Sequence, residues 1–168
     1  MTLQLCQPAP EHEATYRSYI TELGDENRIP FPLDFEHADF SAWLTRVENL
    51  ANGSDVPEGF VPSTTYFLMD GDELIGVSNL RHYLNDRIRE HGGHIGLGVR
   101  PSLRGKGIGN QLMALTIVEA RKKGIGEIHI HCLKENLPSA RTIQHNGGEL
   151  HSEVMEGSHL VQRYIVPA

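Results

Sequence analysis

The chain has 168 residues, of which 39% are hydrophobic, a proportion that is ordinary for a folded domain. Its formal net charge of −7, with the histidines neutral, argues against a nucleic-acid partner, because binding to phosphates depends on excess positive charge. No apolar run is long enough to cross a membrane, and the first residues lack the basic and apolar regions of a secretory signal. Two cysteines are too few for a disulfide framework. We therefore expect a single cytoplasmic domain over residues 1–168, without a nucleic-acid or membrane partner.

The N-terminal half predicts a strand, two helices and a pair of strands. In chain order these are a strand over residues 3–7, helices over 10–23 and 40–50, and strands over 64–69 and 74–80. The segment 25–34 contains two prolines and is expected to be a loop. Asp70-Gly71-Asp72 is typical of a hairpin turn between the last two strands.

The C-terminal half alternates strands with helices. In chain order we expect a strand over 95–99, a helix over 110–123, a strand over 128–133, a helix that Asn136 caps, and strands over 149–156 and 159–166. Gly96 and Gly98 inside their strand indicate a bulge or a close approach of a ligand to the backbone. The whole order, β-α-α-β-β-β-α-β-α-β-β, predicts a mixed α/β fold with a central mixed sheet flanked by helices.

A glycine-rich loop between the strand at 95–99 and the next helix is the most informative segment of the chain. Gly105, Gly107 and Gly109 allow tight turns and remove each Cβ that would keep a ligand away from the backbone. The first N–H groups of the helix have no internal partner, and Arg104 and Lys106 add positive charge. The segment therefore predicts a binding site for a diphosphate or similar anion. The residues expected to contact it are Arg104, Gly105, Lys106, Gly107, Ile108, Gly109 and Asn110.

Two common nucleotide-binding loops do not fit this segment. In a P-loop, Arg100 would occupy the position of the first glycine, and Gly107 would replace the Ser or Thr that holds Mg²⁺. In a dinucleotide fingerprint, Asn110 or Leu112 would replace the third glycine. A nucleotide-binding protein that uses the same glycines nevertheless remains an alternative function.

The segment from Arg104 to Gly109 fits the pattern R/Q-x-x-G-x-G/A and resembles the acetyl-CoA loop of the GNAT superfamily of N-acetyltransferases. The phrases GGHIGLGVRPSLRGKG and HCLKENLPSARTIQHNGGEL resemble a bacterial branch of that superfamily, and the close match extends over residues 80–166. The resemblance implies the GNAT-like acyl-CoA N-acyltransferase fold, with acetyl-CoA as cosubstrate and no metal. It implies direct transfer of an acetyl group to a primary amine of a small molecule or peptide. A homodimer and a larger acyl group are left open.

Acyl transfer requires stabilisation of the thioester oxygen and a base that deprotonates the acceptor ammonium ion. Main-chain N–H groups of Leu97, Gly98 and Val99 are the expected partners of the cofactor's pantetheine and carbonyl group, as the resemblance also implies. His94 starts the same strand and is our candidate for the catalytic base, because a neutral imidazole suits the deprotonation of an amine. The alternative is a half-exposed histidine beside a glycine turn.

The departing thiolate also requires a proton donor. The family often has a tyrosine seven residues after the capping asparagine, but Ile143 occupies that position here. Ser139 is our candidate for contact with the sulfur, and water or Tyr164 are alternatives. Asn136 and Ser139 are also expected to contact the cofactor, although helix capping alone would explain Asn136. Cys132 on an apolar strand is expected to fill the core.

A metal site is not expected, because His129 and His131 share a face of their strand but no third ligand lies at suitable spacing. The missing tyrosine at Ile143 leaves a second class of function open, which is a non-catalytic module that binds acyl-CoA as a sensor or regulator. The acceptor pocket is expected to form from the loop at 25–39, the second helix and the segment 81–93. The acceptor itself is not identified by the sequence.

Overall fold

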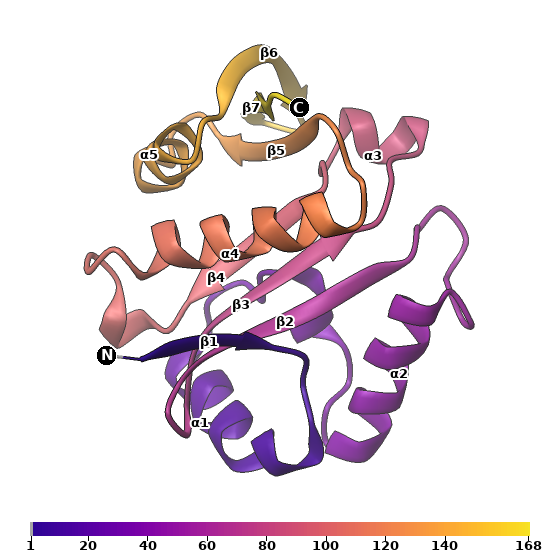
Figure 1. Cartoon of the computed structure of the whole chain (residues 1–168), viewed down its shortest axis with the longest axis vertical. Coiled ribbons are helices and arrows are strands. Elements are labelled where there is room, and N and C mark those ends of the chain that lie inside the picture. Colours follow the sequence, from indigo (N-terminus) through magenta and orange to yellow (C-terminus); the bar gives the residue numbers. More distant parts are fainter. Residues whose placement is uncertain (1) are drawn as a thin grey trace.

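Two antiparallel sheets organise the helices in the computed structural model, which describes residues 2–168 (Figure 1). The strands are β1 (Leu3–Cys6), β2 (Ser63–Asp70), β3 (Glu73–Arg81), β4 (Ile95–Val99), β5 (Ile128–Leu133), β6 (Glu149–Glu156) and β7 (His159–Val166). The helices are α1 (Glu13–Leu23), α2 (Phe40–Asn52), α3 (Asp86–Glu90), α4 (Ile108–Lys122) and α5 (Leu137–His145), with short 3-10 turns at Pro10–His12, Phe31–Asp34 and Pro101–Leu103.

The first sheet has the order β1-β2-β3-β4 and is covered on both faces (Figure 1). On one face, α1 and α2 bury an aromatic core that includes Tyr16, Trp43 and Phe67. On the other face, α4 packs Ile108 and Leu112 against β2 and β3. Successive residues of a strand point to opposite faces, so β2 supplies both cores from one continuous run of buried side chains.

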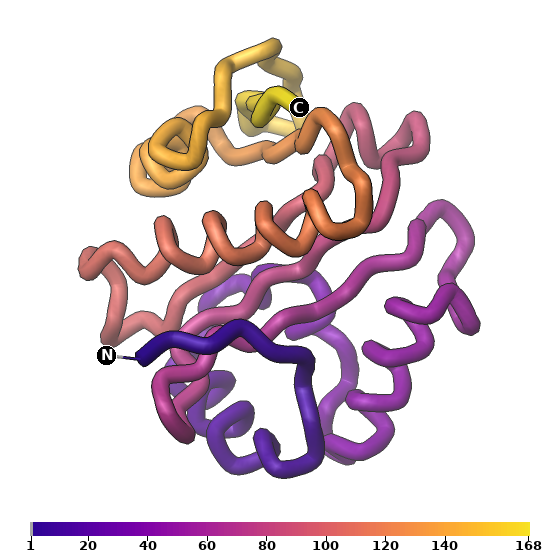
Figure 2. The backbone as a smooth tube through the Cα atoms, in the orientation of Figure 1, coloured from indigo at the N-terminus to yellow at the C-terminus, as the bar shows by residue number. Residues whose placement is uncertain are grey.

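The second sheet has the order β5-β7-β6 and packs with α5 at the upper end of the molecule (Figure 2). It meets the first sheet where β4 and β5 begin: the N–H of His94 donates to the carbonyl of His129, and Gly93 forms an isolated bridge with Ile130. Beyond this junction β4 and β5 belong to different sheets. The expected single mixed sheet is therefore replaced by two antiparallel sheets, whose separation leaves one edge of β4 without a partner strand in the described chain.

The α/β class and the order of the long elements are confirmed, and three details differ from the sequence-based expectation. The helix after the glycine-rich loop begins at Ile108 rather than Asn110, because Gly107 adopts the N-cap position. The short helix α3 lies between residues 80 and 95, where the sequence predicts no element, and the side chain of Asn85 caps it. The register of β4 against β3 is continuous, so the predicted bulge is absent there; in this sheet the register shifts instead between β2 and β3, where Leu68 and Met69 pair with Gly76 and Leu74 and Ile75 is the extra residue.

No helix in residues 2–168 combines the length and apolar character needed to cross a bilayer.

Candidate active site

The loop between β4 and α4 presents a row of unused main-chain donors. Gly105 and Gly107 adopt φ angles of +79° and +81°, and a Cβ at either position would meet no protein atom within 4 Å. The first hydrogen bond of α4 runs from the N–H of Gln111 to the carbonyl of Gly107. Within residues 2–168, the six N–H groups from residue 105 to residue 110 therefore donate to no protein acceptor. This arrangement, at the positive end of the α4 dipole, suits a bound anion.

The two basic residues of this loop differ in how free they are. The guanidinium of Arg104 forms two hydrogen bonds with Glu26, at 2.8 and 3.2 Å, and its Nε donates to the carbonyl of Val99. Lys106 is exposed and forms no ion pair in the part of the chain that the structure describes. Lys106 is thus available to pair with a bound anion, whereas the charge of Arg104 is paired with Glu26 in the segment that follows α1.

An ion pair between buried Arg100 and partly exposed Glu22 holds the start of the loop against α1. Arg100 is 4% exposed; it donates through Nε to the carbonyl of Leu74 and through one terminal nitrogen to Glu22 at 3.2 Å. The second oxygen of Glu22 accepts the N–H of Ser102 at 2.7 Å. Burial alone would raise the pKa of Glu22, but the hydrogen bonds from Ser102 and Arg100 lower it overall. The carboxylate therefore stays charged and fixes the entry to the loop.

The free edge of β4 supplies a second set of main-chain groups. The N–H of Arg81 donates to the carbonyl of His94, and the N–H of Arg100 donates to the carbonyl of Ile75. Because these groups alternate along an antiparallel pair, the N–H of Gly98 faces β3, whereas those of Leu97 and Val99 face the free edge. Leu97 and Val99 are thus placed to bind a ligand alongside β4, and Gly98 is not placed to do so through its N–H.

The glycines of β4 have a packing role on the other side of the strand. A Cβ on Gly98 would lie 2.5 Å from the carbonyl oxygen of Ile29 and 3.6 Å from the hydroxyl of Tyr19. A Cβ on Gly96 would lie 3.5 Å from Pro30. The close approach that these glycines allow is therefore made by the segment between α1 and α2.

His94 is enclosed at the junction of the two sheets and is 5% exposed. Its Nδ1 accepts the N–H of His129 at 2.9 Å, so the neutral ring carries its proton on Nε2. Burial, followed by the charges of His129, Arg89 and Arg81, lowers its pKa to about 4. An imidazole whose free lone pair is already used is a poor base, so we do not retain His94 in that role.

His131 lies beside this junction and its Nδ1 accepts the N–H of Gly92 at 3.0 Å. Burial and the charge of Arg163 lower its pKa to about 4. Within the described residues, no group of His, Cys, Asp and Glu side chains is arranged to hold a metal ion. The histidines of β5 are therefore neutral groups that join the two sheets.

The start of α5 shows how Asn136 and Ser139 are held. The side chain of Asn136 accepts the N–H of Ser139 at 3.2 Å, which confirms the expected N-cap. Burial raises the pKa of the Cys132 thiol, and a hydrogen bond with Ser139 opposes that effect. Ile143 is fully buried. The hydroxyl of Tyr164 donates to Gln162 at 2.9 Å and accepts from Gln144 at 3.4 Å, so it is already engaged within the fold.

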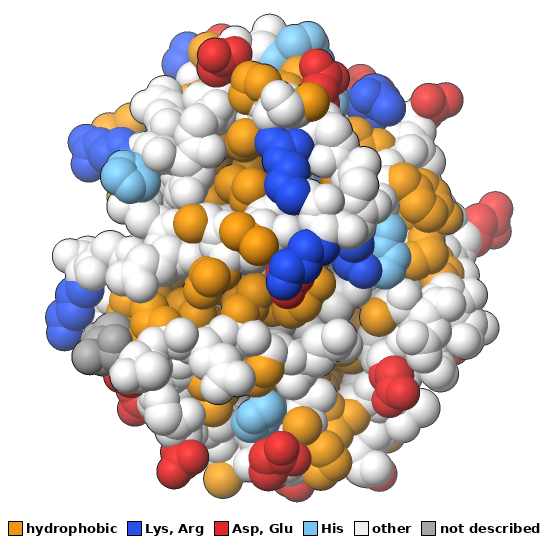
Figure 3. All heavy atoms as spheres, viewed as in Figure 1, with side chains coloured by type: hydrophobic (Ala, Val, Ile, Leu, Met, Phe, Trp, Pro, Cys, Tyr) orange, Lys and Arg blue, Asp and Glu red, His pale blue; other side chains and the backbone are white. Residues whose placement is uncertain are grey.

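A depression of about 520 Å³ lies next to the loop on the segment that follows α1. Its lining contains three carboxylates, those of Asp25, Glu26 and Asp34, and one guanidinium, that of Arg28. Glu26 also pairs with Arg104, so the depression adjoins the glycine-rich loop. Its net negative charge favours a cationic molecule. Figure 3 shows a separate indentation of the surface on the left of the view, between α5 and the start of α4.

A family model for the acetyltransferase (GNAT) family matches residues 16–147. The chain therefore belongs to the GNAT family of acetyltransferases, as the glycine-rich loop predicts, and the enzyme class and the cosubstrate acetyl-CoA follow from that membership. Comparison with curated protein sequences gives no match.

Solved structures share the fold at low sequence identity. Ribosomal-protein-S5-alanine acetyltransferase from Vibrio fischeri superposes with a TM-score of 0.75 at 14% identity, over 99% of this chain and 93% of that one. RimL, a ribosomal L7/L12 alpha-N-protein acetyltransferase in complex with coenzyme A, gives 0.71 at 20%, over 99% and 94%. A chimera of the spermidine N-acetyltransferase SpeG from Vibrio cholerae and hSSAT gives 0.68 at 14%, over 99% and 96%.

Three residues of this region were not identified from the sequence: Glu22, Arg100 and Tyr19. A charged residue between the apolar end of β4 and a proline was a visible signal for Arg100. The residues that all three contact lie far away in the chain, and no local pattern marks them.

Proposed function

We propose that this chain is a single N-acetyltransferase domain that transfers an acetyl group from acetyl-CoA directly to a primary amine of a small molecule or peptide. The relatives above act on a ribosomal-protein alanine, on the N-terminus of L7/L12 and on spermidine, all of which present an amine. The acidic depression beside the loop supports a cationic acceptor. The cytoplasm, where acetyl-CoA and such amines meet, is the proposed location.

The row of free N–H groups from residue 105 to residue 110 carries this proposal. A diphosphate bound there would satisfy donors that the protein leaves unused, and Lys106 would add a charge. The positive φ angles of Gly105 and Gly107 aim these donors, and the space around both glycines is open to a ligand. The residues present therefore fit the diphosphate of coenzyme A.

The remaining contacts follow from the position of β4. The N–H groups of Leu97 and Val99 would bind the pantetheine and the thioester carbonyl, and they would stabilise negative charge on its oxygen during transfer. Asn136 and Ser139, at the start of α5, would contact the other side of the pantetheine. Acetyl-CoA supplies the acetyl group as a reactive thioester.

The acceptor must lose a proton before it attacks, since an alkyl ammonium with a pKa near 10.4 is neutral in only about one molecule in 10³ to 10⁴ at pH 7. Because His94 is engaged with His129, we propose that the acceptor reaches the site already neutral, after losing its proton to solvent. The rate is then expected to increase with pH up to the pKa of the acceptor.

The proposal is tested in two steps with the purified protein. Calorimetry with coenzyme A, ATP and NAD should show binding of coenzyme A alone, and absence of that binding would refute the proposal. Thiol release from acetyl-CoA is then followed over a panel that contains spermidine, amino acids and short peptides with free N-termini. Coenzyme A binding without turnover on any amine would favour a sensor or regulatory module, in keeping with the absence of a hydroxyl at Ile143.

A further inference from the structure

Arg81, the last residue of β3, is a half-buried arginine that pairs with no carboxylate in residues 2–168. One terminal nitrogen donates to the carbonyl of Gly93 at 2.9 Å, and the guanidinium forms no other hydrogen bond within the described chain. Burial, followed by the charge of Arg87, lowers the pKa of Arg81, and no carboxylate opposes these effects. A partly buried charge without a counter-ion is costly to a protein, so its position beside β4 requires an explanation.

The side chain of Arg81 is held in place at the start of β4. Its guanidinium carbon lies 5.2 Å from the centre of the Phe31 ring, and a Cβ on Gly92 would lie 2.9 Å from its nitrogen Nη1. Phe31 in turn packs edge-on against Phe60 at 5.6 Å, and Phe60 is 37% exposed. The guanidinium is thus fixed against an aromatic ring, while its Nε and Nη2 donors stay unused.

The segment that follows α1 connects Arg81 with the proposed thioester site. Pro30 of this segment lies against Gly96 of β4, and the next residue, Phe31, lies against the guanidinium. The same segment belongs to the region that we expect to line the acceptor pocket. Arg81 therefore lies where a bound acceptor would extend beyond the start of β4.

Three further arginines surround this position and form no ion pair with the residues that the structure describes: Arg87, Arg89 and Arg163. The charges of Arg81 and Arg89 both act on His94 at the junction of the two sheets. The nearby carboxylates of Glu90 and Glu156 lie 3.8 and 3.3 Å from the ring nitrogens of His91 instead. These arginines are therefore available to a negatively charged group that the chain itself does not supply.

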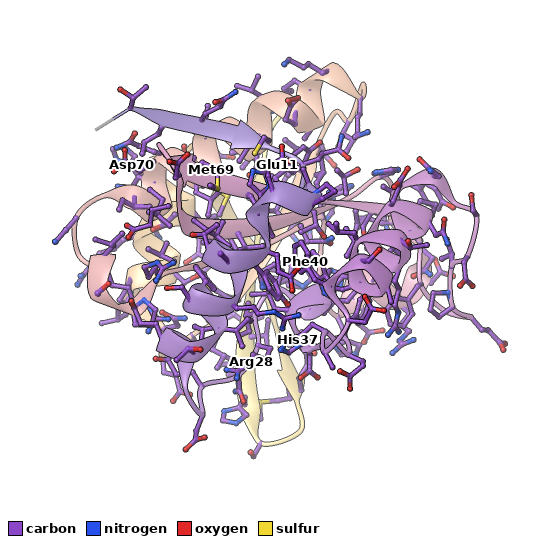
Figure 4. The ribbon with its side chains drawn as sticks, turned by 90° about the horizontal axis from the view of Figure 1, so that it is seen from below. Glu11, Arg28, His37, Phe40, Met69 and Asp70 are labelled. Atoms are coloured by element: carbon purple, nitrogen blue, oxygen red, sulfur yellow. The ribbon has the colours of Figure 1, made fainter. Side chains whose placement is uncertain are left out.

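Arg28, which Figure 4 labels, shows a different arrangement. It follows α1 and lines the acidic depression together with the carboxylates of Asp25, Glu26 and Asp34. Its positive charge is therefore balanced by carboxylates of the same depression. Arg81 differs because no carboxylate acts on it, and this difference marks it as a binding group rather than as one more arginine outside an ion pair.

Resting on the function proposed above, we propose that Arg81 binds a carboxylate of the acceptor, and that the acceptor is a peptide N-terminus with an acidic residue at its second or third position. The carboxylate would accept hydrogen bonds from Nε and Nη2, which form a planar pair of donors. Arg81 is then a residue that determines specificity, because it binds the acceptor away from the reacting atoms. A polyamine, which carries no carboxylate, would not use this contact.

The position of the acidic residue follows from the length of β4. Gly93, which accepts the hydrogen bond of Arg81, precedes Leu97 by four residues, or about 13 Å of extended strand. A carboxylate on the guanidinium would then lie roughly 10 Å from an amine at the thioester. A free amino acid is too short for this span, whereas an extended peptide adds about 3.4 Å per residue and reaches it with a side chain at its second or third position.

The test compares pentapeptides of alanine, amidated at the C-terminus, that carry Glu, Gln or Lys at the second or third position. Thiol release from acetyl-CoA measures kcat/KM for each peptide. In the better of the two positions, the wild type should prefer Glu to Gln at least about tenfold, mainly through KM. Arg81→Gln should reduce this preference to within about twofold. Arg81→Glu should reverse it in favour of Lys, which a merely structural role of Arg81 does not predict.

Arg46→Gln is the matched control. The guanidinium of Arg46 also lies over a phenylalanine ring, that of Phe35 at 3.6 Å, but it comes from α2 and forms no hydrogen bond at the start of β4. This variant should keep the preference of the wild type for Glu. Calorimetric titration of the coenzyme A complex with the same peptides adds a measurement of binding that needs no turnover.

Equal kcat/KM values for the Glu and Gln peptides in the wild type would overturn the assignment, as would equal losses of preference in Arg81→Gln and Arg46→Gln. Faster acetylation of spermidine than of any peptide would refute the assignment and leave the proposed function intact. Binding of the Glu peptide that depends on Arg81, in a protein that acetylates no amine, would support the assignment and refute the proposed transfer. Failure of the wild type to bind coenzyme A would refute both.

Discussion

The two ends of β4 differ in how they use their hydrogen-bonding groups. In the loop that follows the strand, the six successive N–H groups from residue 105 to residue 110 donate to no acceptor in the described chain, and the space beside Gly105 and Gly107 is open. At the start, His94 and His129 exchange two hydrogen bonds in a buried contact. Both ends contain residue types found in active sites, namely glycines beside basic residues at one and histidines at the other. The two regions therefore differ in whether their N–H groups have protein acceptors, and this difference, rather than residue type, distinguishes the proposed binding site from the structural junction.

The largest effect on stability is expected from breaking the contact between His94 and His129 at the start of β4. His94→Ala removes a buried ring and leaves the N–H of His129 without its acceptor, so the free energy of unfolding should fall by about 3 kcal/mol at pH 7.5. Urea unfolding measures this loss. His159→Ala, whose side chain is 58% exposed, should change the free energy by less than about 0.5 kcal/mol. Similar small losses in both variants would show that the junction does not hold the sheets together.

The same contact predicts how stability depends on pH. The pKa of His94 falls from 6.5 in the unfolded chain to about 4 in the fold, so the unfolded state binds more protons between these values. The contribution of His94 to the free energy of unfolding is about 3 kcal/mol; it is fully present above pH 6.5 and is lost as the pH falls toward 4. Urea unfolding at several pH values should show a smaller decrease in His94→Ala; an equal decrease would contradict this assignment.

A smaller effect on stability is expected from substitutions in the glycine-rich loop that follows β4. Gly107→Ala forces a side chain into the left-handed region and should cost about 1 kcal/mol of stability. Gly124 follows α4 with the same φ of +81° and the same open space, so Gly124→Ala should cost a similar amount. Calorimetry should show that the affinity for coenzyme A falls at least about tenfold in Gly107→Ala and stays unchanged in Gly124→Ala. The reason is that Gly107 lies among the N–H groups proposed to bind the diphosphate, whereas Gly124 does not. Equal affinities in the two variants would place the site elsewhere.

The smallest effect is expected from breaking the ion pair between Arg104 and Glu26, which would free a positive charge beside the glycine-rich loop. Glu26→Gln releases Arg104, which should raise affinity for coenzyme A about threefold at low salt and less at high salt. Stability should change by less than about 1 kcal/mol, since the pair is exposed. Glu13→Gln, which removes another exposed ion pair of α1, is the control and should leave affinity unchanged. A lower affinity in Glu26→Gln would show that the ion pair supports binding instead.

Local patterns explain what could be predicted from the sequence. The bounds of β4 to β7 follow from short apolar runs between glycines and polar turns, and the glycine-rich loop encodes its own geometry within six residues. The N-cap at Asn136 is likewise a local signal. Such features depend on neighbours in the chain, so no knowledge of the tertiary structure is needed.

Long-range contacts explain what could not be predicted. His94 is suited to catalysis as an isolated imidazole, but the N–H that occupies its Nδ1 comes from β5. Arg104 carries a free charge in the sequence, but Glu26 lies 78 positions away and pairs with it. The five-residue helix α3 is too short to show a period of its own, and its capping residue Asn85 lies in a polar stretch.

The contact between Gly98 and the carbonyl of Ile29 has a consequence for the evolution of this enzyme. At 2.5 Å from a Cβ on residue 98, this carbonyl excludes alanine unless the segment between α1 and α2 moves. Homologues that carry a larger residue at position 98 must therefore have remodelled the segment near residue 29, and the two positions should covary. If that segment lines the acceptor pocket, as proposed, a change in acceptor preference would be coupled during divergence to a change in β4, the strand proposed to bind the cosubstrate.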